Sequence, residues 1–216
     1  MAKSYVVFGL GEFGTSVAKE LMENGFDVLA CDVDEMKIDA ISDTVTGAVV
    51  FNALESTAYE KLGLEAMDGA VIGITENLEA AIMAILAAKE AKIPQIIAKA
   101  ANDTQKEIFG KLGAHKIVMP ERDGGMRLAR NIVSGNFLDY IELSEKICMI
   151  EFAVKESWFG HSLIELHLRE RYRLNVIALK RKDKLSTNID PHAPFEQNDI
   201  VFIVIARDDL DKLERE

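Results

Sequence analysis

Residues 5–14, YVVFGLGEFG, decide the fold of this chain. Four apolar residues predict a short buried strand, and the Gly-x-Gly-x-x-Gly spacing behind them is typical of a tight turn into a helix. Gly9 permits the turn, Gly11 lets a pyrophosphate approach the backbone, and Gly14 lets the helix pack closely on the strand. The helix N-terminus offers amide donors and a field that favours phosphate. The stretch predicts a nucleotide site; the alternative is a tight turn without a ligand.

An acidic residue stands where such a site needs one. A second apolar run, residues 28–31, ends at Asp32, close to the expected distance of about 20 residues from the glycines. A carboxylate there accepts hydrogen bonds from both hydroxyls of a ribose and disfavours a 2′-phosphate, so we expect NAD rather than NADP among dinucleotides. The alternative is a solvated carboxylate at a strand end.

Strand-like runs alternate with helical patterns as far as Pro120. The runs are rich in Val, Ile and Ala without polar alternation, which is typical of a parallel sheet covered on both faces, and the alternation implies right-handed βαβ crossovers. We predict an α/β fold, a Rossmann-like doubly wound parallel sheet followed by a smaller α+β domain. The expected strands are 5–8, 28–31, 48–51, 70–75, 96–99 and 116–119. Asp34 is the expected N-cap of a helix with Met36, Ile38 and Ile41 on its apolar face, and further helices are expected at 55–62, from Asn77 to before Pro94, and at 104–112.

The pattern changes after Glu121. Residues 122–137 predict a long helix, and residues 139–143 connect it to a second unit. There we expect strands at 147–154, 175–181 and 199–206, helices at 162–172 and 208–216, and a turn at 182–184. The predicted domains are a nucleotide-binding domain over 1–121, a connecting helix and linker over 122–143, and a C-terminal ligand-binding domain over 144–216.

Composition excludes several classes of protein. The chain has 216 residues, 25 of them Lys or Arg and 36 Asp or Glu, for a net charge of −11. An acidic balance argues against a nucleic-acid binder and against direct attraction to anionic lipid. No apolar run approaches the roughly 20 residues of a spanning helix, and the first residues have no signal-peptide layout, so we expect a cytoplasmic protein without membrane insertion. Cys31 and Cys148 lie in apolar runs, which favours buried reduced thiols over a disulfide.

Over its whole length the chain resembles the cytosolic regulatory subunits of Trk/Ktr-type potassium uptake systems, which have an RCK N-terminal domain followed by an RCK C-terminal domain. The resembling stretches are residues 7–14, 28–34, 97–100, 111–125 and 175–181. The stretch 111–125, KLGAHKIVMPERDGG, is more specific to this family than the glycine motif, which many dehydrogenases share.

The resemblance implies a gating subunit and not an enzyme. It implies dimers that form an octameric ring at the inner face of the membrane, held there by a potassium-translocating subunit. It also implies that ATP, ADP or NAD(H) binds the N-terminal domain and that cyclic di-AMP binds the C-terminal domain.

The same resemblance implies two sets of site residues. For the nucleotide these are Gly9, Gly11, Glu12, Phe13, Gly14, Asp32, Val33, Asn52, Ala53, Thr75, Lys99 and Glu121. Glu121 is also the candidate ligand of Mg²⁺ or another cation. For cyclic di-AMP they are Leu163, Ile164, Arg169, Asn175, Val176, Ile177, His192 and Pro194.

Three of these positions have a second interpretation. Several ATP-responsive relatives have Arg where this chain has Glu12, and a carboxylate there repels a triphosphate unless a cation lies between them. Glu12 therefore favours NAD, ADP or a cation-assisted ATP. Lys99 could be a solvated lysine at a strand end, and Glu121 could simply favour the dipole of a helix that starts at Pro120. The basic residues between 169 and 184 could likewise be a solvated face.

Two other functions compete with the gating subunit. A small NAD-dependent oxidoreductase needs a substrate domain and a catalytic acid or base, yet only about 75 residues follow the nucleotide domain and connector. An NADH-responsive redox sensor of the transcriptional kind needs a basic recognition helix, and we expect none because the chain starts directly at the sheet. The four histidines are scattered without zinc spacing, which argues against a metal enzyme.

Overall fold

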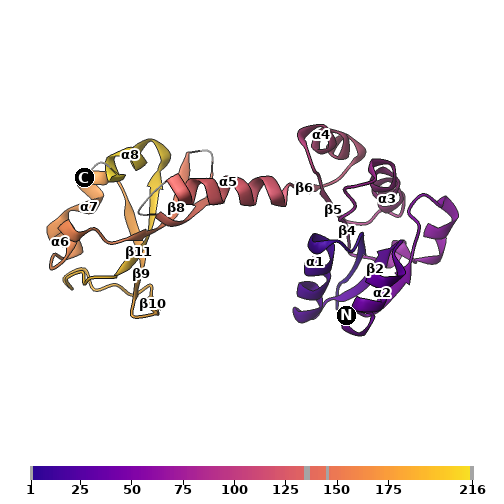
Figure 1. Cartoon of the computed structure of the whole chain (residues 1–216), viewed down its shortest axis with the longest axis horizontal. Coiled ribbons are helices and arrows are strands. Elements are labelled where there is room, and N and C mark those ends of the chain that lie inside the picture. The colour runs from indigo at the N-terminus through magenta and orange to yellow at the C-terminus, as the bar shows by residue number, and fades with distance from the viewer. Residues whose placement is uncertain (1, 134–136, 145, 215–216) are drawn as a thin grey trace. The chain divides into compact units, whose positions relative to one another are not determined.

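The computed structural model describes residues 2–133, 137–144 and 146–214. It divides into two compact units, residues 1–121 and 122–216, each with its own apolar core (Figure 1). No helix of the described residues is both long and apolar enough to cross a membrane.

Unit 1 contains a parallel six-stranded sheet in the order β3-β2-β1-β4-β5-β6, so the predicted doubly wound fold is confirmed. Its strands are β1 (Ser4–Phe8), β2 (Asp27–Asp32), β3 (Gly47–Val50), β4 (Gly69–Ile72), β5 (Gln95–Lys99) and β6 (Lys116–Val118). Its helices are α1 (Glu12–Glu23), α2 (Glu35–Ile41), α3 (Leu78–Glu90) and α4 (Asp103–Leu112), with 3₁₀ turns η1 (Ser42–Thr44), η2 (Ser56–Lys61) and η3 (Leu64–Ala66). The direction of winding reverses between β1 and β4, which is where ligands bind in open α/β sheets.

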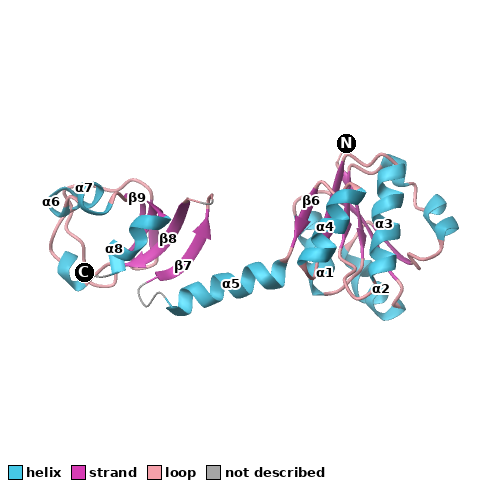
Figure 2. Cartoon of the chain, turned by 90° about the horizontal axis from the view of Figure 1, so that it is seen from above, coloured by secondary structure: helices cyan, strands magenta, loops and turns pink. Residues whose placement is uncertain are grey.

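The central strand shows why the helices cover both faces of this sheet (Figure 2). Side chains alternate along a strand, so Val7 joins the apolar cluster under α1 and α2, whereas Val6 and Phe8 join the cluster under α3 and α4. All three side chains are fully buried. A strand buried on both faces has no polar positions, which explains its continuous apolar sequence.

Local signals set most helix ends. Asp34 caps α2 as expected, its Oδ1 accepting from the Met36 N–H at 3.0 Å. Ile38 and Ile41 are buried, but Met36 is 77% exposed and does not belong to the apolar face. The helix expected at 55–62 is the 3₁₀ turn η2, and the strand expected at 70–75 already ends at Ile72.

Unit 2 starts at Arg122, inside helix α5 (Pro120–Val133), whose first two residues belong to unit 1. It contains a five-stranded antiparallel sheet in the order β10-β9-β11-β8-β7. The strands are β7 (Phe137–Glu142), β8 (Ile147–Ala153), β9 (Asn175–Arg181), β10 (Lys184–Ser186) and β11 (Ile200–Ala206). The short helices are α6 (Leu163–Leu166), α7 (Leu168–Tyr172) and α8 (Leu210–Glu214), with 3₁₀ turns η4 (Glu156–Trp158) and η5 (Arg207–Asp209). The predicted α+β character is confirmed.

The prediction of a linker at 139–143 is wrong for Asp139–Glu142, which belong to strand β7. The long helix ends at Val133, residues 134–136 lie outside the described residues, and β7 pairs antiparallel with β8 at the edge of the sheet. Tyr140 is buried in the core of unit 2, and its hydroxyl accepts a hydrogen bond from Arg207 Nε at 2.9 Å. An edge strand carries polar side chains between its apolar ones, which is why the sequence looked like a connector.

The helix expected at 162–172 is also interrupted. His167 adopts φ 47°, ψ 39° and separates α6 from α7. The segment from 208 starts as η5 before α8, and residues 215–216 of the expected helix lie outside the described residues. The expected turn at 182–184 is a hairpin that leads into the additional strand β10.

Candidate functional site

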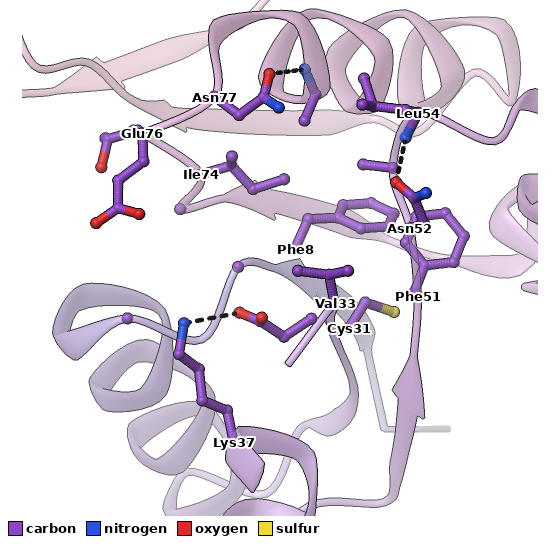
Figure 3. Close-up of a pocket in the computed structure, with 17 residues that line it drawn as sticks. Phe8, Cys31, Val33, Lys37, Phe51, Asn52, Leu54, Ile74, Glu76 and Asn77 are labelled. Atoms are coloured by element: carbon purple, nitrogen blue, oxygen red, sulfur yellow. Dashed lines mark hydrogen bonds and ion pairs between the residues drawn. The ribbon is translucent and has the colours of Figure 1, made fainter. Parts of the chain in front are cut away.

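A pocket of about 380 Å³ opens at the carboxyl ends of β1, β2, β3 and β4 (Figure 3). It lies at the point where the direction of winding reverses. Its lining comes from the loop after each of these strands: Phe8, Gly9 and Gly11; Cys31, Asp32, Val33 and Lys37; Phe51, Asn52, Ala53 and Leu54; and Gly73, Ile74, Thr75, Glu76, Asn77 and Ala80.

The glycine loop is held by contacts that leave no room for side chains at two positions. Gly9 has φ 89°, and its N–H donates to the Cys31 carbonyl at 2.8 Å. A Cβ on Gly14 would lie 1.9 Å from the Gly9 carbonyl oxygen, so α1 packs directly on the loop. A Cβ on Gly11, in contrast, would meet no atom within 4 Å. Gly11 therefore leaves open space on the pocket side, as backbone that receives a phosphate must.

A further glycine, Gly73, brings a second loop against the glycine loop, and the sequence analysis does not predict this contact. Gly73 follows β4, its N–H donates to the Phe8 carbonyl at 2.7 Å, and a Cβ there would lie 2.9 Å from the Gly9 carbonyl oxygen. The β4 loop thus passes close to the glycine loop. The signal that could have revealed it is a glycine directly after an apolar strand.

Asp32 is the buried carboxylate of the pocket, 8% exposed. Its Oδ2 accepts from the Leu10 N–H at 2.6 Å, and its Oδ1 accepts from the Asp34 N–H at 2.9 Å. Lys37 lies 3.6 Å from Oδ2 (Figure 3). Each carboxylate oxygen can accept more than one hydrogen bond, so Asp32 can hold the loop and still accept from a ligand hydroxyl.

The opposite side of the pocket is apolar and aromatic. Phe8 and Phe51 lie with ring centroids 5.5 Å apart, and Tyr59 packs on Phe51 at 4.8 Å behind them. Val33 and Leu54 are 69% and 44% exposed at the rim. Flat apolar surfaces of this kind suit a nucleobase.

Hydrogen bonds fix the loop that follows β3. The Tyr59 hydroxyl donates to the Ala53 carbonyl at 2.9 Å. Asn52 Oδ1 accepts from the Leu54 N–H at 3.1 Å, and its Nδ2 donates to Glu55 at 3.1 Å. These hydrogen bonds therefore hold the backbone in place at the end of the pocket that is lined by Phe8 and Phe51.

The remaining polar groups of the pocket are a buried thiol, a helix cap and an exposed carboxylate. Burial, and secondarily the charge of Asp32, raise the pKa of the Cys31 thiol to about 12, so it stays protonated at neutral pH. Asn77 Oδ1 caps α3 by accepting from the Ala80 N–H at 3.0 Å, and Glu76 is exposed at the rim. Among the described residues no group of three or more His, Cys, Asp or Glu is placed to hold a metal ion.

The structure brings seven of the twelve expected nucleotide residues to the pocket: Gly9, Gly11, Asp32, Val33, Asn52, Ala53 and Thr75. Gly14 lies beneath the loop, and Glu12 and Phe13 start α1 outside the lining. Lining residues missed from the sequence include Phe8, Lys37, Phe51, Ile74 and Glu76. Phe8 ends β1, Lys37 lies in α2, and the other three lie in the loops after β3 and β4; strand order brings them together, and no local motif marks them.

Lys99 and Glu121 are expected residues that form a separate pair. Lys99 Nζ lies 2.5 Å from Glu121 Oε1 and 5.9 Å from the centroid of the Phe13 ring. The Lys99 side chain is 13% exposed, and its hydrogen bond holds the pKa of Glu121 below the usual range. Glu121 is therefore paired with Lys99, and among the described residues no group of three or more His, Cys, Asp or Glu gathers around it.

The residues expected to bind cyclic di-AMP lie on four parts of unit 2. Leu163 and Ile164 are in α6, Arg169 is exposed in α7, and Asn175, Val176 and Ile177 are in β9. The loop with His192 and Pro194 reaches α6, because the Ile164 N–H donates to the Pro191 carbonyl at 3.3 Å and Pro194 forms a bridge with Ser162. Arg181 of the basic group is not available for a phosphate, since it pairs with Asp199 at 2.6 Å and with Glu196 at 2.8 Å.

Two domain models match the chain in sequence. The TrkA-N domain matches residues 5–120, and the TrkA-C domain matches residues 149–216. The chain belongs to the TrkA-N/TrkA-C family. The family indicated by the sequence resemblance is therefore confirmed.

Curated members of the TrkA-N/TrkA-C family match over nearly their whole length. The Ktr system potassium uptake protein C of Bacillus subtilis (strain 168) is 35% identical over 215 residues, which cover 100% of this chain and 97% of that protein. The Ktr system potassium uptake protein A of Vibrio alginolyticus is 33% identical over 208 residues, with coverage of 96% and 94%.

Solved structures support the fold of this TrkA-N/TrkA-C chain. The GsuK RCK domain superposes with a TM-score of 0.67 at 15% identity and covers 99% of this chain, but this chain spans only 47% of that one. The TrkA-N domain of the Escherichia coli inner membrane protein ybaL gives a TM-score of 0.52 at 21% identity, with coverage of 62% and 96%. At these identities the likeness concerns the fold alone.

Proposed function

We propose that the chain is a nucleotide-binding regulatory subunit that gates a Trk/Ktr-type potassium transporter in the membrane. The observation that carries this proposal is a preformed pocket at the glycine loop, in a chain that matches Ktr potassium uptake proteins over nearly its full length. The subunit would work in the cytoplasm, at the inner face of the membrane, through contact with the transporter.

The ligand we propose is an adenosine nucleotide with a diphosphate, as in ADP or NAD(H). The Phe8 and Phe51 side would take the base, Asp32 the ribose, and the open backbone at Gly11 the phosphates. Glu12 and Glu76 are both exposed near this path, so a third phosphate adds repulsion. ATP would therefore bind with its own divalent cation, such as Mg²⁺.

Regulation rather than turnover fits the groups that line the pocket. Its ionisable side chains are Asp32, Glu76, Lys37 and the protonated Cys31. Asp32 is occupied by two backbone donors, and its charged neighbour in the lining is the Lys37 ammonium at 3.6 Å. We therefore assign these groups to ligand binding and not to proton transfer in a hydride-transfer reaction.

Calorimetric titration with ADP, ATP with and without Mg²⁺, NAD and NADH tests the ligand. We expect ADP to bind, and ATP to gain affinity when Mg²⁺ is added. Failure of all five to bind would refute the site. Consumption of NADH with a small-molecule substrate would instead support the oxidoreductase alternative, and binding of NADH without turnover would support a redox sensor.

The partner is tested by potassium uptake in cells that express a Ktr-type membrane subunit with or without this chain. We propose dimers that assemble into an octameric ring, because a ring lets nucleotide binding in many copies act together on one transporter. The mass of the purified protein with ADP should then correspond to eight chains. A monomer at high concentration, or uptake that does not depend on the chain, would refute the gating role.

We further propose cyclic di-AMP as a second ligand, bound to unit 2 where the His192–Pro194 loop meets α6. Titration of cyclic di-AMP into protein saturated with ADP should give a separate binding event. Replacement of Arg169 by Ala should weaken that event and leave ADP binding unchanged. Competition between the two ligands for one site would refute a separate second site.

A further inference from the structure

Lys37 is a pocket residue to which the sequence assigns no role. It lies in the first turn of α2, and its side chain runs to the carboxylate of Asp32 (Figure 3). It is the one basic residue in the lining that the structure describes. Its side chain is 45% exposed, whereas that of Asp32 is 8% exposed, so the ammonium stands at the open side of the pair.

Asp32 does not need Lys37 in order to be oriented. Two backbone N–H groups, of Leu10 and Asp34, already hold its two oxygens at 2.6 and 2.9 Å. The Lys37 Nζ is 3.6 Å from Oδ2, which is longer than an ordinary hydrogen bond. Within the described residues no hydrogen bond from this ammonium is seen, so its donors can contact a ligand that enters the pocket.

We propose that Lys37 and Asp32 both form hydrogen bonds with the same ribose hydroxyl. This inference rests on the proposed adenosine nucleotide. A hydroxyl donates one hydrogen bond and accepts others, so it can donate to the Asp32 carboxylate and accept from the Lys37 ammonium. The pair makes Lys37 a specificity-determining residue. The group that satisfies both partners is a free hydroxyl.

Other substituents satisfy only one partner or neither. A 2′-phosphate has acceptors for Lys37 but none of its ionised oxygens can donate to Asp32, and Asp34 and Glu35 at the start of α2 add further negative charge. A deoxyribose that lacks the contacted hydroxyl offers no partner to either side chain at that position. The site should therefore prefer an unmodified ribose over both, and should lose part of its preference over the deoxyribose without Lys37.

The test compares ADP, 2′-deoxy-ADP, 3′-deoxy-ADP and 2′-phospho-ADP by titration into the wild type and Lys37→Met. A charge-assisted hydrogen bond predicts about a tenfold loss of ADP affinity in Lys37→Met. The deoxy-nucleotide that binds the wild type most weakly should lose less than about threefold, because it lacks the hydroxyl that Lys37 contacts. Lys37→Arg should keep most of the ADP affinity.

Lys111→Met is the matched control. Lys111 also pairs with a carboxylate, at 2.6 Å from Glu107 Oε1, but it is exposed on α4 outside the pocket lining. Its replacement should leave all four affinities unchanged. Thermal unfolding of each variant without ligand shows that the fold is intact.

Two results would overturn the inference while the proposed function stands. ADP affinity could be unchanged in Lys37→Met, or ADP and both deoxy-nucleotides could weaken by the same factor, which would indicate a general charge effect. If the wild type binds none of the four nucleotides, the proposed function and the inference fail together.

Discussion

Substitution of Gly11 and of Gly14 by alanine distinguishes the two roles of glycine in this loop, which are close helix packing at Gly14 and access of a ligand at Gly11. At Gly14 a Cβ would lie 1.9 Å from the Gly9 carbonyl oxygen, a distance that forces α1 away from β1. At Gly11 the backbone has φ −72° and ψ −176°, which alanine adopts freely, and no atom lies within 4 Å of the Cβ. Gly14→Ala should therefore damage the fold, and Gly11→Ala the ligand site.

The magnitudes differ enough to measure. Overpacking at a buried position costs about 1–3 kcal/mol, which at roughly 2–4 °C per kcal/mol lowers the Tm of Gly14→Ala by several degrees. For Gly11→Ala, a loss of a few tenths of a kcal/mol at the N-cap opposes a gain of about 0.4–1 kcal/mol from the less flexible unfolded chain. Its Tm should stay within about 2 °C of the wild type.

The assay is thermal unfolding with and without ADP. A ligand at 100 times its Kd adds about 2.7 kcal/mol, so the wild type should shift by roughly 5–11 °C. Gly11→Ala should show no such shift, because its methyl group occupies the space where the phosphates approach the backbone. A Gly14→Ala protein that melts like the wild type, or a Gly11→Ala protein with the full ADP shift, would refute this reasoning.

Four further predictions concern other parts of the chain. Asp32→Ala removes the acceptor of the Leu10 N–H and should lower the free energy of unfolding by about 1–3 kcal/mol in urea titrations, besides weakening ADP binding; unchanged stability would contradict the role given to this hydrogen bond. Arg181→Met leaves the Asp199 carboxylate, 1% exposed, without its cation and should destabilise unit 2 by about 3 kcal/mol; a wild-type urea midpoint would count against it. Gly124→Ala and Gly125→Ala, in α5 with nothing within 4 Å of either Cβ, should each raise stability by about 0.4–1 kcal/mol, and a lower Tm would show that the open space is needed. Because the pKa of Cys31 is raised from 9.0 to about 12, the contribution of this thiol to the free energy of unfolding is complete below pH 9 and is lost as pH rises toward 12. Cys31→Ala should therefore make the fall in stability over this range less steep, by up to about 1.4 kcal/mol per pH unit. Equal slopes in the two proteins would contradict the buried thiol.

The parts of the site that were predictable depend on residues close together in the chain. Gly9, Gly11 and Gly14 follow one strand, Asp32 ends the next, and Asp34 caps the helix after it. The role of each residue depends on backbone geometry within a few residues, so the spacing in the sequence is enough to predict it. The strand β7 and the break at His167 were missed because pairing with β8 and packing in unit 2 override local propensity there.

By itself the sequence determined the order of the strands in unit 1, the glycine loop and the acid at the end of β2. Only the tertiary structure decided which loops meet. Parallel pairing of β1 with β4 places Gly73 and Ile74 against Gly9, and it brings the β3 loop to the same pocket through β2. The structure also places Lys37 beside Asp32 and joins Lys99 to Glu121 outside the pocket. The physical reason is that side-chain neighbours across a parallel sheet follow from strand order and register, which are set by burial of the whole core and not by any short motif.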